Sequence, residues 1–532
     1  MTACVIPLLV FSLTVSLTVA AFPPAGFAEA AYVFSVPLII WSFYRPNYRI
    51  FLGTSAIAGF VSWLILIWWL RHVTYLGTFA LSGFLTLFLV GWALVVRMIL
   101  PSIEGRGFSV RLPVLLGLAG FWVLLEYMRG FVLTGFPWLP LAASQWDRAA
   151  VLQIAAYTGY TGVSFVLIFF NLGLGVYLRR MLTRRRAEEW YEKICPEFYV
   201  ALFLLVGTAS GLIWSEVFNQ RQERLFSVTL VQPYIEQPSK WDPEKTMEIF
   251  RTLEKQTLFA DGLGGEVIFW PESVTPLPVK GNHLAREWTE ELVRRIDNPI
   301  VMGNIAKEDE FWYNIVCAVT PDEGLIEPYY TKRKLVPFGE YVPFGGLLSF
   351  IDKFVPMAGL FRRGEKAVVI PVKIGNSTYR VGALVCYEDI FSQLSRENVK
   401  AGADLVFVAT NNAWYGEEGG AYQHAAHSVL RAVETRRPFI RCGNSGWSGW
   451  IDEYGNVRKV LVVPEKGIYF RGSELFELKR DAKWVRRESF YVLYGDWFIS
   501  ICLGLSIWGY ICFRFARGSR YEPGALLRGK RN

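Results

Sequence analysis

Apolar residues run along this chain in two different patterns. In the first, stretches of about 20 residues are almost free of charge, which is the length that a helix needs to cross a hydrocarbon core of roughly 30 Å. Eight such stretches lie near residues 5–22, 27–44, 50–71, 76–96, 112–130, 160–178, 198–217 and 494–513. The pattern therefore predicts a polytopic α-helical membrane domain of eight spans.

The block between residues 219 and 490 has the second pattern. Strand-length apolar runs lie near 225–231, 266–270, 299–305, 314–319, 380–385, 404–409 and 438–442, and helical periodicities lie near 245–261, 283–296 and 422–436. Strands that alternate with helices indicate an α/β layered domain with its own core. We therefore expect a membrane domain at 1–218, an α/β domain at 219–490 inserted between spans seven and eight, and a last span with a basic cytoplasmic tail at 491–532.

The composition agrees with a membrane protein and suggests its orientation. The chain is 52% hydrophobic and 19% charged, with a mean hydropathy of +0.28. Lys and Arg accumulate in cytoplasmic loops, and here they gather near 45–49, 97–111 and 179–193 and in the tail after 513. This bias places the α/β domain outside the cytoplasm. The net charge of +8 is then explained by the basic cytoplasmic loops, and a nucleic-acid partner is not indicated.

Two features near the membrane stretches bear on this topology. No basic segment precedes the first stretch, so we expect a retained helix instead of a cleaved signal. Glu126 lies near the end of the fifth stretch, with Arg129 one helical turn later. An ionisable residue at a span is a functional candidate, and a structural ion pair and a lipid-facing role are both open for these two.

The seven cysteines form no C-x-x-C pair, so neither a zinc site nor a disulfide framework is indicated. Only Cys317, Cys386 and Cys442 fall in the α/β block. An exposed lone thiol is a liability in an oxidising compartment. A thiol kept at the end of a strand there is easier to explain if the protein uses it.

Cys386 ends the apolar run 381–385 and is followed by Tyr387, Glu388 and Asp389. A thiol of ordinary pKa is mostly protonated at neutral pH and needs a cation or a base to react. Lys332 and Glu272 lie at loop or strand ends of the same block. Each of the three alone has a plain structural explanation, but together they are the groups that thiol-based acyl transfer requires.

Four segments carry a family resemblance: 135–138 (GFPW), 240–243 (KWDP), 335–343 (LVPFGEYVP) and 385–388 (VCYE). The order Glu272, Lys332, Cys386 in these contexts resembles the carbon-nitrogen hydrolase (nitrilase) superfamily. The eight-span frame resembles the apolipoprotein N-acyltransferases of bacterial inner membranes. This resemblance implies a nitrilase-like layered sandwich for the α/β domain, with the domain on the periplasmic side.

The resemblance also implies a role for each residue that matches a family motif. Glu272 is expected to be the general base, Lys332 the group that stabilises the oxyanion, and Cys386 the acyl carrier. The supporting residues are expected to be Glu340, Tyr387, Glu388, Trp241, Asn314 and Trp414, with interior packing for Trp414 and a lipid entry as its alternative.

Two positions depart from the family pattern. Lys334 stands where His is common, so the choice between Lys332 and Lys334 depends on the register of the motif. Asn412 stands where Asp is common. No metal or cofactor is expected, because His424 and His427 share a helix without a third convergent ligand.

The resemblance implies a ping-pong acyltransferase in the membrane, expected as a monomer. A phospholipid would give its acyl chain to Cys386, and the α-amine of a diacylglyceryl-cysteine apolipoprotein would accept it. A membrane-tethered amidase that uses water as the acceptor shares the same three groups and stays open. A transporter or scaffold with a degenerate hydrolase domain is disfavoured, because none of the three groups is missing.

Overall fold

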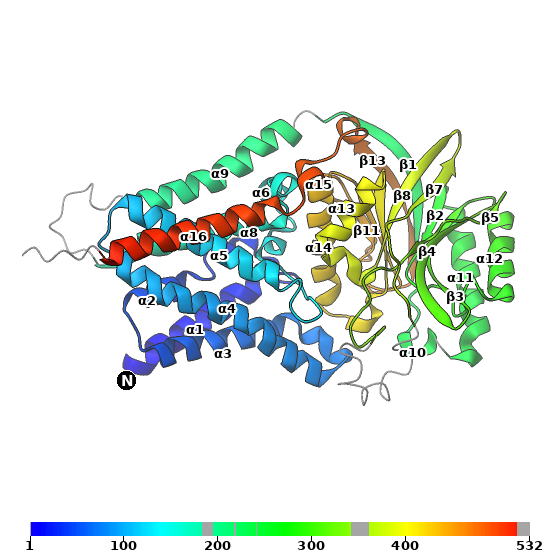
Figure 1. Ribbon diagram of the computed structural model, residues 1–532. Helices are drawn as coiled ribbons and strands as arrows, with labels where there is room; N and C mark the ends of the chain where they lie inside the picture. The colour runs from blue at the N-terminus through cyan, green and yellow to red at the C-terminus, as the bar shows by residue number, and fades with distance from the viewer. Residues whose placement is uncertain (1, 184–194, 218–219, 241, 342–360, 519–532) are drawn as a thin grey trace, which may run out of the picture.

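The structure is a computed structural model that describes residues 2–183, 195–217, 220–240, 242–341 and 361–518. Apolar helices form one end of the molecule and the strands form the other, with α13 and α14 between them (Figure 1). The main helices of the first end are α1 (Thr2–Ala21), α2 (Val36–Phe43), α3 (Tyr48–Leu66), α4 (Tyr75–Ile103), α5 (Phe108–Met128), α8 (Tyr160–Thr183), α9 (Pro196–Val217) and α16 (Trp497–Gly518).

Five of the described helices are long and apolar enough to cross a membrane, namely α3, α4, α5, α8 and the Trp497–Ala516 part of α16. They coincide with the stretches predicted near 50–71, 76–96, 112–130, 160–178 and 494–513. Shorter apolar helices lie at Val5–Ala21, Ala28–Phe43 and Pro196–Ser210, where the other three spans were predicted. The protein thus carries membrane helices, and those three spans stay predictions.

The last helix, α16, packs closely against α5 even though more than 350 residues separate them in the sequence. Small residues allow this approach, as is common between membrane helices. A Cβ on Gly120 would lie 2.6 Å from the carbonyl oxygen of Cys502, and one on Gly509 would lie 2.6 Å from that of Pro113. After the α/β domain, the chain therefore returns to the membrane helices and packs α16 against α5.

The α/β domain contains two sheets. The first has the order β13-β1-β2-β3-β4-β5, with β6 paired to β4, and the second has the order β12-β11-β10-β9-β8-β7. The strands of the first are β1 (Gln222–Gln232), β2 (Val267–Trp270), β3 (Ile300–Glu308), β4 (Phe311–Thr320), β5 (Gly324–Leu325), β6 (Tyr330–Thr331) and β13 (Gly472–Asp481). Those of the second are β7 (Val369–Ile374), β8 (Ser377–Val385), β9 (Leu405–Thr410), β10 (Phe439–Gly443), β11 (Gly449–Ile451) and β12 (Val457–Val460).

The two sheets face each other across an apolar core, and helices cover their outer faces. Phe269 of β2 meets Phe407 of β9 with ring centroids 4.6 Å apart. Helices α11 (Thr246–Asp261) and α12 (His283–Ile296) cover the first sheet, and α13 (Ser392–Lys400) and α14 (Gly420–Thr435) lie on the side of the second sheet that faces the membrane helices (Figure 1). The predicted α/β layered sandwich is confirmed, and each predicted strand-length run contains a strand.

Helix α14 joins the two parts of the molecule. Every residue in it except Tyr422 is buried, because one side meets the sheet and the other meets the membrane helices. Gln423 accepts hydrogen bonds from the indole nitrogens of Trp69 and Trp138, each at 2.9 Å. Its amide nitrogen donates to the carbonyl oxygens of Pro23 (3.1 Å) and Leu66 (2.8 Å). One polar side chain thus satisfies four groups at the junction.

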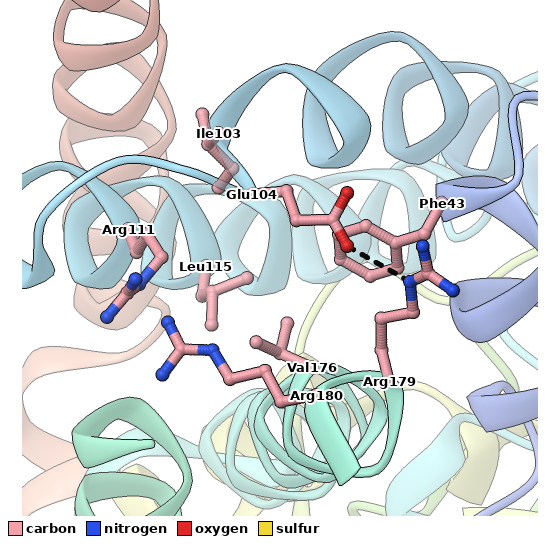
Figure 2. Close-up of a pocket in the computed structure, with 8 residues that line it drawn as sticks. All are labelled: Phe43, Ile103, Glu104, Arg111, Leu115, Val176, Arg179 and Arg180. Carbon is pink, nitrogen blue, oxygen red and sulfur yellow. Dashed lines mark hydrogen bonds and ion pairs between the residues drawn. The ribbon is translucent and has the colours of Figure 1, made fainter. Parts of the chain in front are cut away.

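The opposite end of the helices carries a small hollow, which Figure 2 shows. It is lined by Phe43, Ile103, Glu104, Arg111, Leu115, Val176, Arg179 and Arg180. Arg179 Nε lies 3.0 Å from Glu104 Oε1, and its guanidinium lies 4.3 Å from the ring centroid of Tyr44. These arginines lie in the end turns of α5 and α8, within the basic segments that the charge bias assigns to the cytoplasm. The candidate chemistry lies at the other end of the helices, within the α/β domain.

Candidate active site

Cys386 lies at the carboxyl end of β8, where the strand turns into a short 3-10 helix (Cys386–Ile390). Its φ of 49° places it in the left-handed region, which costs an L-residue roughly 1–2 kcal/mol. Backbone strain of this kind is concentrated at functional sites. The turn holds the thiol at the strand end with 7% of the residue exposed.

Lys332, Glu272 and two further predicted residues form one cluster. The ammonium nitrogen of Lys332, which follows β6, lies 2.9 Å from Glu340 Oε1 and 3.5 Å from Glu272 Oε1. The amide nitrogen of Asn314, on β4, donates to Glu272 Oε1 at 2.9 Å and to Glu340 Oε1 at 3.2 Å. Different segments of the first sheet and its loops thus bring the carboxylates of Glu272 and Glu340 to the ammonium of Lys332.

Burial is the main effect that keeps the thiol of Cys386 neutral at rest. Burial and the charge of Glu272 raise the pKa of Cys386 to about 12, and the positive charge of Lys332 opposes this shift. Burial alone disfavours the ammonium of Lys332, but the carboxylates of Glu340 and Glu272 outweigh it and raise its pKa. The site therefore holds a charged lysine next to a thiol that needs a base before it can attack.

The register of the lysine motif is resolved by geometry. Lys334 lies with its ammonium 4.9 Å from the ring centroid of Phe391, whereas Lys332 is 1% exposed and lies between the two carboxylates. The position that the resemblance implied for the lysine is thus the one that faces the acids.

Glu388 lies at the site, but its carboxylate is bound mainly to backbone nitrogens. Its carboxylate accepts hydrogen bonds from the hydroxyl of Tyr330 (2.8 Å) and from the backbone nitrogens of Val385 (2.8 Å), Arg333 (2.6 Å) and Lys334 (3.0 Å). It therefore ties the segment that carries Lys332 to the turn that carries Cys386.

Tyr387 links the same turn to the membrane domain. Its hydroxyl donates to the carbonyl oxygen of Gly135 at 2.9 Å. Gly135 has a φ of +78°, and a Cβ there would lie 2.2 Å from the carbonyl oxygen of Gly130, so the loop requires glycine. Directly after GFPW, the backbone nitrogen of Leu139 donates to His427 Nε2 at 3.2 Å. The GFPW segment thus forms the membrane-domain side of the junction.

Two predicted supporting residues stand apart from this cluster. Trp414 is 48% exposed, so interior packing was the wrong expectation: the short helix that carries it (Asn412–Tyr415) turns this ring to the surface. Trp241 lies outside the residues that the structure describes.

Sequence reasoning missed several polar residues near the thiol. The ammonium of Lys240 donates to the carbonyl oxygen of Glu272 at 3.1 Å, and burial lowers its pKa to about 8 against the raising effects of Glu272 and Cys386. Thr410 Oγ1 lies 3.4 Å from Cys386 Sγ. A usable signal existed for Thr410, because it ends an apolar strand run in the same way as Cys386 does.

A buried charge network lies behind the thiol. Asp389 pairs with His424 Nε2 at 2.8 Å and with Arg441. Burial disfavours the carboxylate, but these two partners outweigh it and hold the pKa of Asp389 below its usual range. Within the described residues, no group of three or more His, Cys, Asp or Glu side chains is arranged to hold a metal ion.

Glu126 and Arg129 are both buried, with 3.9 Å between Glu126 Oε1 and the nearest guanidinium nitrogen. Glu126 Oε1 accepts from the backbone nitrogen of Leu141 at 2.7 Å, and Arg129 lies over the ring of Trp63 at 5.2 Å. The sequence left open a structural ion pair or a lipid-facing role for these two residues, and these contacts match the ion pair. Both residues also line a hollow of about 700 Å³, measured out to its open mouth, between α1, α3, α4 and α5.

Comparison with known proteins adds two family matches. Residues 16–173 match the apolipoprotein N-acyltransferase N-terminal domain, and residues 227–470 match the carbon-nitrogen hydrolase domain. An apolipoprotein N-acyltransferase from Geobacter metallireducens is 30% identical over 93% of this chain and 92% of its own. One from Allorhizobium ampelinum is 29% identical over 84% of this chain and 86% of its own. Among solved structures, a Nesterenkonia AN1 amidase of the nitrilase superfamily covers 50% of this chain and 95% of its own, at 17% identity and a TM-score of 0.38.

Proposed function

The chain belongs to the apolipoprotein N-acyltransferase family, and from this premise we propose that it works through a thioester on Cys386. The thioester receives an acyl chain from a membrane phospholipid. It then passes the chain to the N-terminal α-amine of a diacylglyceryl-cysteine apolipoprotein, which completes lipoprotein maturation. The observation that carries this proposal is the convergence of Cys386, Lys332 and two carboxylates at a turn bonded to the membrane domain.

In the first step Glu272 takes the proton from Cys386 Sγ, and the electron pair left on sulfur attacks the ester carbonyl carbon of the phospholipid. The carbonyl oxygen becomes negative, and Lys332 stabilises it as a hydrogen-bond donor. The carbon–oxygen ester bond then breaks. The leaving oxygen takes the proton from Glu272, so lysophospholipid departs and the acyl chain remains on sulfur.

In the second step the α-amine of the apolipoprotein attacks the thioester carbonyl carbon. Glu272 takes a proton from the attacking nitrogen, and Lys332 again stabilises the oxyanion. The carbon–sulfur bond breaks, an amide forms, and the sulfur regains its proton from Glu272. The two substrates use the site in turn, so the kinetics are ping-pong.

Glu340 and Asn314 position the catalytic groups. Glu340 lies closer to Lys332 than Glu272 does, so the lysine stays charged while Glu272 gains and loses a proton. Asn314 donates to both carboxylates and keeps them at a fixed separation. No metal or cofactor is needed for these steps.

The membrane helices give the proposal its location. Both substrates carry long acyl chains, and keeping these chains in a bilayer avoids exposing apolar surface to water. We place the α/β domain on the periplasmic side of the bacterial inner membrane, as the basic loops favour, and expect a monomer.

The proposal is tested by incubating the protein with phospholipid and a diacylglyceryl-cysteine peptide and following amide formation by mass spectrometry. Cys386→Ala should form no amide. Cys512→Ala, the same change in α16, should form it at the rate of the unmodified protein. Amide formation by Cys386→Ala would contradict the proposal, and release of free fatty acid without amide would point to the tethered amidase.

A further inference from the structure

Thr410 lies beside the nucleophile because of strand register. In the parallel pair β8 and β9, Val385 is opposite Ala409, so the residues that follow, Cys386 and Thr410, are brought side by side. Thr410 is fully buried. Its hydroxyl oxygen lies 3.4 Å from Cys386 Sγ and 3.1 Å from Asn412 Oδ1. A hydroxyl has one hydrogen to donate, so these two acceptors compete for it.

The amide oxygen of Asn412 has a second partner. It lies 3.0 Å from His424 Nδ1, and the other ring nitrogen of His424 lies 3.0 Å from the carbonyl oxygen of Cys386. Thr410, Asn412 and His424 thus close a ring of contacts that begins at the sulfur and ends at the backbone of the same residue. Asn412 keeps its contact with His424 when the hydroxyl of Thr410 turns away.

A buried carboxylate, Asp389, holds His424 of this ring in place. Asp389 lies 2.8 Å from His424 Nε2 and accepts from the hydroxyl of Ser428 at 2.6 Å. Arg441 pairs with the same carboxylate. All of these side chains are buried, so the ring cannot easily exchange its contacts for water.

We propose that Thr410 is a catalytic residue whose hydroxyl hydrogen changes acceptor when Cys386 ionises. It bonds to Asn412 Oδ1 while the sulfur carries its proton, and it rotates about the Cβ–Oγ1 bond to donate to the sulfur once that proton has moved to Glu272. The S–H bond breaks, its electron pair stays on sulfur, and no covalent bond of Thr410 changes. This assignment rests on the proposed function, because it assumes that the thiolate of Cys386 is the attacking group.

Lys332 is shared, so the sulfur depends on further donors, and the hydroxyl of Thr410 acts on it together with the backbone N–H of Asn411. Its ammonium lies against two carboxylates, at 2.9 and 3.5 Å, and so only part of its charge acts on the sulfur. A hydroxyl carries no net charge, and burying it beside the thiol costs far less than burying another cation. A hydrogen bond to a charged acceptor is stronger than one to a neutral acceptor, so the switch favours the thiolate selectively.

The test compares Thr410→Val with Thr410→Ser. Valine keeps the shape of threonine and removes the hydroxyl, whereas serine keeps the hydroxyl and removes the methyl group. The rate at which iodoacetamide alkylates Cys386 is measured against pH in the absence of lipid, with peptide mass spectrometry to separate this cysteine from the others. Thr410→Val should react about tenfold more slowly at neutral pH, with its profile moved to higher pH, and Thr410→Ser should follow the unmodified protein.

Two results would overturn the assignment: a profile for Thr410→Val that coincides with that of the unmodified protein, or a Thr410→Ser variant as slow as Thr410→Val. If Thr410→Val does not fold, Asn412→Ala tests the same switch from the other side. It removes the competing acceptor, so alkylation should be at least as fast as in the unmodified protein, and slower alkylation contradicts the switch.

The alkylation test is separable from the proposed function. If alkylation depends on the hydroxyl of Thr410 but the unmodified protein forms no amide, the proposed function fails and the role of Thr410 in stabilising the thiolate stands. If amide forms normally and Thr410→Val leaves the profile unchanged, the proposed function stands and this inference fails.

Discussion

The ammonium of Lys332 lies 2.9 Å from the carboxylate of Glu340, which makes Glu340 its nearest acidic partner. Glu272 lies farther away, at 3.5 Å. The two acids can therefore have different roles: Glu340 balances the charge of Lys332, and Glu272 remains able to exchange a proton. This division underlies the proposed mechanism.

Glu340→Gln tests that division. The variant removes the nearest carboxylate from Lys332, so the ammonium is left to pair with Glu272 and holds it away from the thiol, and amide formation should fall by roughly ten- to a hundredfold. The rate is measured with the peptide assay at saturating phospholipid. Glu323→Gln, the same change on an exposed turn, should keep the full rate; an equal rate for Glu340→Gln would contradict the role of Glu340.

The bond from Tyr387 to Gly135 is predicted to hold the turn that carries Cys386 against the membrane domain. Tyr387→Phe removes this bond and should cost about 1 kcal/mol of stability. Hydrogen exchange in residues 129–140 should become faster. Tyr379→Phe is the matched control, because it removes a tyrosine hydrogen bond to the carbonyl oxygen of Leu225, inside the α/β domain. Equal exchange in both variants would show that the bond does not hold the junction.

The thiol of Cys386 gives stability a defined pH dependence. Its pKa is raised to about 12 in the folded protein, so above the ordinary thiol pKa of about 8.5 the unfolded chain loses this proton while the folded protein keeps it. The contribution is complete at neutral pH and is lost as the pH rises toward 12. Between pH 8 and 10, the melting temperature of the unmodified protein should fall more steeply than that of Cys386→Ala. Parallel curves would mean that Cys386 is not held neutral.

The close packing of α5 on α16 predicts a sharp cost for one added methyl group. In Gly120→Ala the new Cβ would lie 2.6 Å from the carbonyl oxygen of Cys502, so the helices must separate, at a cost of about 1–3 kcal/mol. In Gly53→Ala, on α3, the new Cβ meets no atom within 4 Å. Thermal unfolding in detergent should show a clear loss for the first variant only; equal melting temperatures would contradict the packing of these helices.

The parts of the fold that depend on local pattern could be predicted from the sequence. Apolar runs such as 380–385 and 404–409 could be recognised as strands because their continuous apolar character and their length are visible in one segment. The acid and the thiol of the site follow such runs, whereas Lys332 follows the two-residue strand β6, which is not among the predicted runs. Their meeting point follows once the runs are assembled into sheets.

The rest depends on which segments meet. The periodicity near 422–436 predicts a helix with one buried face, but a single periodic stripe cannot reveal that the opposite face meets the membrane helices. The ring of Thr410, Asn412 and His424 depends on the register of β8 against β9, which no residue in either strand encodes alone. Trp414 is exposed for a similar reason, since the orientation of a ring on one turn of helix follows from its neighbours.

The most direct test of the account is the mass of the intact protein after incubation with phospholipid and without any apolipoprotein. The account predicts one added acyl chain on Cys386. The adduct should be released by hydroxylamine, be absent from Cys386→Ala, and be lost when a diacylglyceryl-cysteine peptide is added and becomes acylated. A folded protein that forms the amide without ever carrying this adduct would contradict the thioester, and with it the role given to Cys386.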